Sequence, residues 1–214
     1  MADIKFFSLV PDVLIEIYGV PSFTIIHTLR RAAIEFCDRT LLWEYSDDFV
    51  YTIAGEIEQD LPIPRGAELI LVVNISRAGE PLTPVAVNKM NRLQGNPTDS
   101  TQWGTPTTYT ADGIKTVRMA PIPNIDEELA CRLALRPTAT ADDVPFEIGT
   151  RWKGALITGA KHFLCLMPNT EWYDPQRAMY YREQFEKEIG RAKITQIQGY
   201  SNGQMRVQSV RFGG

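Results

Sequence analysis

The sequence lacks the features that mark membrane proteins, disulfide-bonded proteins and zinc proteins. It has no apolar run near the roughly 18 residues that cross a bilayer, and residues 1–7 do not resemble a signal peptide. We therefore expect synthesis in a cytoplasm and no membrane partner. The three cysteines (Cys37, Cys131 and Cys165) are widely spaced and form no CxxC pair. We expect them to be buried, reduced thiols and not disulfides or metal ligands.

The sequence is also poor in residues and motifs that carry catalysis. It contains no P-loop and no GxGxxG, and we expect no GxSxG nucleophile elbow. Its two histidines, His27 and His162, fall on predicted helices without an Asp or Cys at ligand spacing, and we interpret both as ordinary helix residues. The acidic residues at 126–128 and 142–143 are contiguous, lack the spacing of a calcium loop, and are predicted in solvated turns. The sequence therefore predicts no catalytic residue, no metal ligand and no cofactor.

A basic excess is missing too. There are 26 Asp and Glu against 22 Lys and Arg, a net charge of −4. A protein that grips DNA through its phosphates usually carries net positive charge. Tight, sequence-independent DNA binding is therefore disfavoured for the chain as a whole.

Helical periodicity is present near the start of the chain. After Pro21, Ser22 is the predicted cap of a helix that runs to about Thr40. Ile34 falls in the middle of its polar face, either as a lone exposed apolar residue or as a contact with a neighbouring subunit. At 100° per residue, the apolar face collects Ile25, Leu29, Ala32, Ala33, Phe36 and Thr40.

From about residue 48 the period changes to two, which is typical of strands. Residues 49–54 and 68–75 are rich in β-branched and aromatic side chains, and 129–135 alternate across Arg132. Residues 107–119 form a predicted hairpin, because Asp112-Gly113 suits a two-residue turn. We expect five to seven strands here.

Helical periodicity returns near residue 146. A largely apolar helix contains Trp152, Leu156, Gly159, Phe163, Leu166 and Met167 on one face. Asp174-Pro175 then predicts the start of a last helix, whose narrow stripe is Ala178, Tyr181, Phe185, Ile189 and Ala192. The predicted fold class is α+β, in which residues 1–47 and 146–197 form a helical bundle. Residues 48–145 form an inserted antiparallel β-lobe, and 198–214 form an extended C-terminal arm.

The arm combines a flexible lead-in with a strand-forming run at 205–212. No acidic residue follows Glu188. One interpretation is a frayed terminus, and the other is an arm that adds a strand to the sheet edge of another subunit. In the second interpretation the docking residues are Met205, Arg206, Val207, Val210, Arg211 and Phe212.

The order of several segments resembles that of the head-to-tail adaptor proteins of tailed phages, in particular those similar to tail tubular protein A of short-tailed phages. The segments that carry the resemblance are 29–37 (LRRAAIEFC), 106–109 (PTTY), 117–123 (VRMAPIP), 152–163 (WKGALITGAKHF) and 178–185 (AMYYREQF).

The resemblance implies a structural virion protein at the head-tail junction, assembled in the host cytoplasm. It implies a ring of twelve copies that binds the portal protein, docks the tail nozzle or next tail protein, and lets genomic DNA pass without specific binding. It also implies that the C-terminal segment reaches the portal, and that no residue is catalytic.

A different function remains open from the residues alone. The β-lobe could recognise a carbohydrate or peptide, with the helices as scaffold. Exposed aromatic side chains on the 95–110 loop, namely Trp103 and Tyr109, would support this alternative. A hydrolytic enzyme would require an acid–base pair that the sequence does not show.

Overall fold

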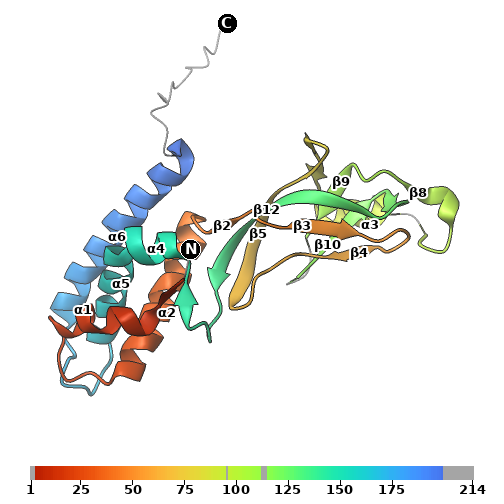
Figure 1. Ribbon diagram of the computed structural model, residues 1–214. Helices are drawn as coiled ribbons and strands as arrows, with labels where there is room; N and C mark the ends of the chain where they lie inside the picture. The colour runs from red at the N-terminus through yellow and green to blue at the C-terminus, as the bar shows by residue number, and fades with distance from the viewer. Residues whose placement is uncertain (1–2, 95, 112–114, 200–214) are drawn as a thin grey trace, which may run out of the picture.

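A computed structural model describes residues 3–94, 96–111 and 115–199. Figure 1 shows most helices gathered at one end of an elongated molecule, with the strands extending away from them. The prediction of a mixed α+β chain with antiparallel sheets is confirmed.

The helical segments are η1 (Phe6–Leu9), α1 (Val10–Leu14), α2 (Ser22–Thr40), α3 (Val87–Leu93), η2 (Ser100–Gln102), α4 (Phe146–Arg151), α5 (Lys153–Cys165) and α6 (Pro175–Gln198). The strands are β1 (Ile4–Lys5), β2 (Glu44–Tyr45), β3 (Phe49–Thr52), β4 (Glu58–Asp60), β5 (Ala67–Arg77), β6 (Glu80–Pro81), β7 (Thr83–Pro84), β8 (Trp103–Gly104), β9 (Thr108–Thr110), β10 (Thr116–Ala120), β11 (Ile122–Pro123), β12 (Glu127–Pro137) and β13 (Asp143–Val144).

The helix α2 buries the face that its sequence predicts. Ile25, Leu29, Ala32, Ala33, Phe36 and Thr40 are all buried. The predicted cap is wrong, because Pro21 occupies the cap position, Ser22 is the first helical residue, and no side chain caps the helix. Pro21 already has the fixed φ that precedes a helix, so the helix begins directly after it.

The C-terminal helices pack against α2 through small residues. A Cβ on Gly159 of α5 would lie 2.8 Å from Cβ of Ala32 on α2 and 3.1 Å from the ring of Phe185 on α6. Only a residue without a side chain fits where these three helices meet.

Of the two last predicted helices, the first is broken in the structure and the second begins where it was predicted. The expected helix from residue 146 is broken at Trp152 into α4 and α5, and Leu166 lies beyond α5 with 46 % of its surface exposed. The predicted start of α6 is confirmed, since the Asp174 carboxylate accepts hydrogen bonds from the backbone N–H groups of Gln176 and Arg177, each at 3.0 Å. Its predicted stripe, Ala178, Tyr181, Phe185, Ile189 and Ala192, is buried throughout.

The largest sheet is built around β12. This strand pairs with β2 and β3 along one edge and with β5 along the other, and β5 also pairs with β6. A second sheet has the order β4-β10-β9-β7, while β1 pairs with β13 and β8 pairs with β11. The pairs β7–β9 and β8–β11 are parallel, which departs from the antiparallel β-lobe that the sequence predicted. The predicted hairpin pairing is confirmed at Tyr109 and Met119, which face each other across β9 and β10. Its predicted turn, Asp112-Gly113, lies outside the described residues.

Buried apolar residues form two clusters, one among the helices and one among the strands, and Trp43 packs against both. The boundaries at 47, 48, 145 and 146 stay predictions. The sequence did not predict α3, which lies among the strands and buries Met90.

Candidate interaction surfaces

The two histidines are not arranged for catalysis. His27 is exposed on α2. His162 lies against the last helix, with its Nδ1 2.9 Å from the carbonyl oxygen of Ala178. Among residues 3–94, 96–111 and 115–199, no group of His, Cys, Asp and Glu is placed to hold a metal ion.

The thiols are free, buried and protonated at neutral pH. Burial raises the pKa of Cys37 and Cys165, and it raises the pKa of Cys131 to about 11. A protonated thiol is a poor nucleophile and a poor metal ligand.

A GxSxG spacing occurs at residues 199–203. It directly follows the helix α6, whereas the serine of a nucleophile elbow sits between a strand and a helix. The context therefore does not suit a hydrolase nucleophile, and Ser201 itself lies outside the described residues.

The prediction of solvated turns at 126–128 and 142–143 is wrong for Glu127 and Glu128, which lie on β12, and for Asp143, which lies on β13. Asp126 accepts a hydrogen bond from the backbone N–H of Ala54 at 2.8 Å, and Glu127 forms an ion pair with Arg77 at 2.8 Å. The other acidic pair begins with Asp142, which lies 3.8 Å from Arg30. Asp126 and Glu127 therefore hold a loop and a pair of strands in place, whereas the Asp142 side chain is 92 % exposed.

The predicted interaction residues have different positions. Ile34 is half-buried on α2 and is less exposed than its place on the polar face predicted. The predicted arm residues Met205, Arg206, Val207, Val210, Arg211 and Phe212 lie outside the described residues.

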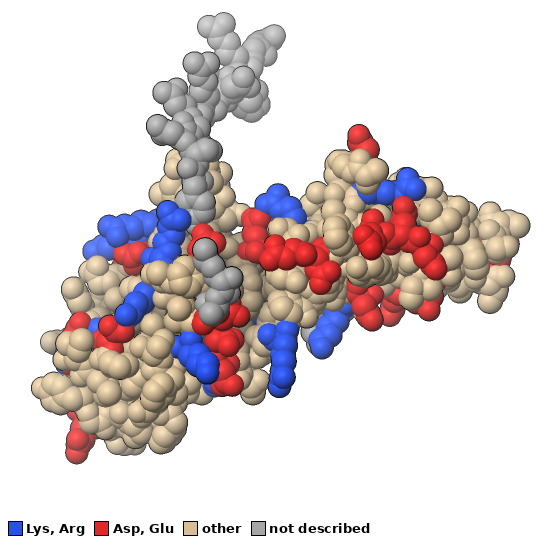
Figure 2. All heavy atoms as spheres, viewed as in Figure 1, with Lys and Arg blue, Asp and Glu red and all other residues tan. Residues whose placement is uncertain are grey.

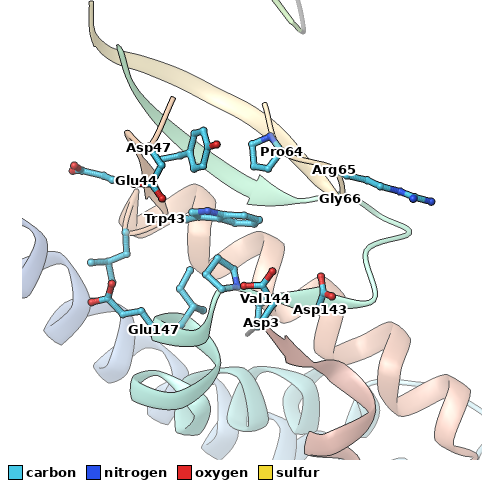
Figure 3. A pocket seen from close by; sticks show the side chains of 14 residues that line it. Asp3, Trp43, Glu44, Asp47, Pro64, Arg65, Gly66, Asp143, Val144 and Glu147 are labelled. Atoms are coloured by element: carbon cyan, nitrogen blue, oxygen red, sulfur yellow. The ribbon is translucent and has the colours of Figure 1, made fainter. Parts of the chain in front are cut away.

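A cleft of about 260 Å³ lies where the helices meet the largest sheet. Figure 3 shows Trp43 spanning it, with Asp3 and Asp143 at one rim, Pro64 and Gly66 at the other, and Arg65 directed away. Glu44, Asp47 and Glu147 also line it. Acidic side chains thus dominate a cleft that the sequence did not predict, because its lining comes from segments far apart in the chain.

A second surface is the outer face of the largest sheet, which we call the acidic sheet face (Asp48, Phe49, Tyr51 and Glu128). The alternation of strand β3 turns Phe49 and Tyr51 outward, with 42 % and 56 % of their surfaces exposed, while Val50 and Thr52 are buried. Tyr51 is directly opposite Glu128 on β12. Arg132 lies on the same face of β12, but it is ion-paired with Glu44.

The carboxylates on and beside this sheet face raise the pKa values of two tyrosines. The Glu128 carboxylate, then burial and the Asp48 carboxylate, raise the pKa of Tyr51. Burial, then the carboxylates of Asp48 and Asp47, raise the pKa of Tyr45 in the neighbouring strand β2. The face therefore presents two aromatic rings within a region of negative potential.

A third surface is the end of α6, which we call the basic helix end (Arg191, Lys193, Ile194 and Ile197). All four residues are exposed, and Ile194 and Ile197 expose 53 % and 68 % of their surfaces. Arg191 pairs with Glu188 on the helix surface at 2.8 Å, with 72 % of its own side chain exposed.

Charge is divided unevenly along the chain. Residues 44–144 contain 15 Asp and Glu against 8 Lys and Arg, a net charge of −7, whereas residues 145–214 contain 6 against 10, a net charge of +4. On the face shown in Figure 2, acidic side chains gather over the strands.

The loop at 95–110 does not display the two aromatic rings that ligand recognition would need. Tyr109 is 4 % exposed. Trp103 lies over Gly55, where a Cβ would lie 2.6 Å from the indole ring, and its Nε1 donates a hydrogen bond to the carbonyl of Pro97 at 3.2 Å. Both rings therefore serve the packing of the strand-rich part.

Exposed apolar side chains are also concentrated near the start of the described chain. Phe7, Ile15, Tyr18 and Phe23 each expose 67 % to 81 % of their surfaces. None of the helices in the described ranges is both long and apolar enough to cross a membrane.

Comparison with known families gives a match over nearly the whole chain. The family model described as SU10 adaptor protein matches residues 9–208. No curated protein matches the chain.

Proposed function

The chain belongs to the SU10 adaptor protein family, and from that premise we propose that it forms a ring between the capsid portal and the tail of a phage virion. The observation that carries the proposal is the family match over residues 9–208. In this role the protein extends the channel through which DNA leaves and presents a platform for the tail nozzle or next tail protein. Assembly takes place in the host cytoplasm, and the finished ring lies at the head-tail junction.

The helical end suits a subunit that must keep its shape under load. Gly159 lets α2, α5 and α6 approach closely. Across α2 and α6, the Glu186 carboxylate lies 2.5 Å from Arg39, and Arg182 lies 2.8 Å from Glu35. A rigid wedge that binds a different surface of the next copy closes into a ring when the rotation per subunit divides a full turn.

The charge of the chain suits passage of DNA. A channel wall that bound phosphates strongly would release counterions and retain the DNA. A net charge of −4 gives no such general attraction. We therefore assign DNA a passing role, without specific contacts.

We assign the portal contact to residues 205–212. Their strand-forming composition suits addition to a sheet edge of the portal, and the gain in backbone hydrogen bonds and buried apolar surface offsets the loss of chain entropy. Ile34 is assigned to a subunit contact, which its partial exposure allows.

The test is to mix the protein with the portal ring of its phage and to measure mass and symmetry by native mass spectrometry and electron microscopy. We expect a closed ring of twelve copies on one end of the portal. A mixture in which the two proteins stay separate, or virions that contain no copy of this polypeptide, would reject the proposal.

A further inference from the structure

We infer that the acidic sheet face of one copy binds the basic helix end of a neighbouring copy. This inference rests on the proposed ring and names the two surfaces that would hold it together. Each surface has exposed apolar side chains beside charges of one sign, and the signs are opposite.

The acceptor surface is fixed by strand register. Because Tyr51 pairs with Glu128 and Phe49 pairs with Ala130, the two rings stand beside each other on one face, next to a carboxylate and a small residue. Asp48 precedes the first ring and is exposed. Exposed aromatic groups at the centre of a contact and charged groups at its rim are typical of protein–protein interfaces.

The donor surface is fixed by helical geometry. At 100° per residue, Lys193, Ile197, Ile194 and Arg191 cover about 160° of the helix circumference, on the side opposite the buried Ile189 and Ala192. Two isoleucines therefore lie between two cations. Glu188 pairs with Arg191 on the exposed helix surface, and no acidic residue follows Glu188, so this end of the chain keeps a net positive charge.

A second copy is the partner that this charge pattern favours. The acidic sheet face repels DNA phosphates, and the basic helix end has a matching acidic surface within its own sequence. The two surfaces differ, so their contact is heterologous, which is the kind that continues from copy to copy until a ring closes. Charges at the rim make such a contact faster to form and sensitive to salt.

The test uses charge reversal on either surface. One variant carries Arg191→Glu and Lys193→Glu, and a second carries Asp48→Lys and Glu128→Lys. A matched control, Lys89→Glu with Arg92→Glu, reverses two exposed cations on α3. Self-association is measured by sedimentation velocity at low and high salt, and on the portal by native mass spectrometry. Circular dichroism verifies that each variant is folded.

We expect either variant alone to weaken self-association about tenfold or more, and the control to behave as the wild type. An equimolar mixture of the two variants, and one chain with all four reversals, should both recover association, since each again offers opposite charges.

A ring that forms with wild-type affinity in either variant would overturn this contact but not the proposed ring. The same holds if a mixture of the two variants does not recover association. A wild-type protein that assembles neither alone nor on the portal would overturn both the contact and the ring. A closed dimer that responds to the reversals as predicted would keep the contact and reject the ring.

Discussion

Removing Glu16 should destabilise the protein far more than removing its partner Lys161. The Lys161 ammonium lies 2.7 Å from a Glu16 carboxylate oxygen, and the lysine side chain is 5 % exposed while that of Glu16 is 48 % exposed. The other carboxylate oxygen accepts a hydrogen bond from the Tyr181 hydroxyl at 2.7 Å. Glu16 lies between α1 and α2, so these contacts tie that connection to α5 and α6.

The difference in burial between Lys161 and Glu16 sets the expected losses of unfolding free energy. Glu16→Ala leaves a buried ammonium unpaired, and we expect the free energy of unfolding to fall by about 3 kcal/mol, near the low end for a broken buried pair. Lys161→Met leaves a carboxylate that water reaches, and a side chain of similar length fills the site, so we expect a loss of about 1 kcal/mol. The double variant should also lose about 1 kcal/mol, which is a coupling of about 3 kcal/mol between the two residues.

The stabilisation that Glu16 contributes should decrease in acid. The hydrogen bond from Lys161, then that from Tyr181, lowers the pKa of Glu16 below its ordinary value of 4.5. Because the folded-state pKa is the lower one, the stabilisation is present above pH 4.5 and is lost as pH falls toward the lowered value. Urea unfolding of the wild type and the three variants at pH 7 and below pH 4.5 measures both effects. Equal losses for the two single variants, or a loss for Glu16→Ala that does not shrink in acid, would refute the reasoning.

Three further predictions concern the rest of the chain. Deleting residues 199–214 should leave the Tm unchanged and weaken portal binding in a pull-down; unaltered binding would contradict the assignment of the arm. Gly55→Ala should lose about 3 kcal/mol in thermal unfolding, because its φ of +80° is strained for Ala and the new Cβ would clash with Trp103. Gly79→Ala is the matched control with a φ of +89° and open space, and should lose only about 1 kcal/mol; equal losses would exclude the clash. Cys37 and Cys131 should react slowly with a thiol reagent at pH 8 until urea unfolds the protein, and rapid labelling of native protein would show that burial does not protect them.

Periodicity predicted those parts of the fold in which one element buries one face. The apolar arc of α2 and the stripe of α6 are confirmed, since burial of a single face requires these periods. The alternation of β12 is confirmed only from Leu129 to Leu133, because Leu133, Ala134 and Leu135 are all buried where the pairing with β5 shifts register. The cap at Asp174 was predictable because an Asp before a Pro is a local signal.

Features that depend on distant contacts were missed. The helix α3 has a short, polar sequence, and its main buried contact is Met90, which strands from elsewhere cover. The break at Trp152 lies within a stretch, Phe146 to Cys165, that contains no Pro, so this local signal for a helix end was absent. The acidic sheet face needs the register that places Tyr51 opposite Glu128, residues far apart in the chain. The local sequence does not predict such long-range pairings.

The contacts of Glu16 also fix a segment that presents exposed apolar side chains. The segment from Phe6 to Tyr18 turns Phe6, Val13 and Ile17 inward and leaves Phe7, Ile15 and Tyr18 exposed. Such apolar residues on a mobile loop would lose conformational entropy whenever they bound a partner. Here Lys161, Tyr181 and Arg177 all bind Glu16, the first two through its carboxylate and the last through its carbonyl oxygen at 3.1 Å. The apolar side chains are therefore presented from a backbone that is already fixed, and a partner that covers them gains the burial without ordering the segment that carries them.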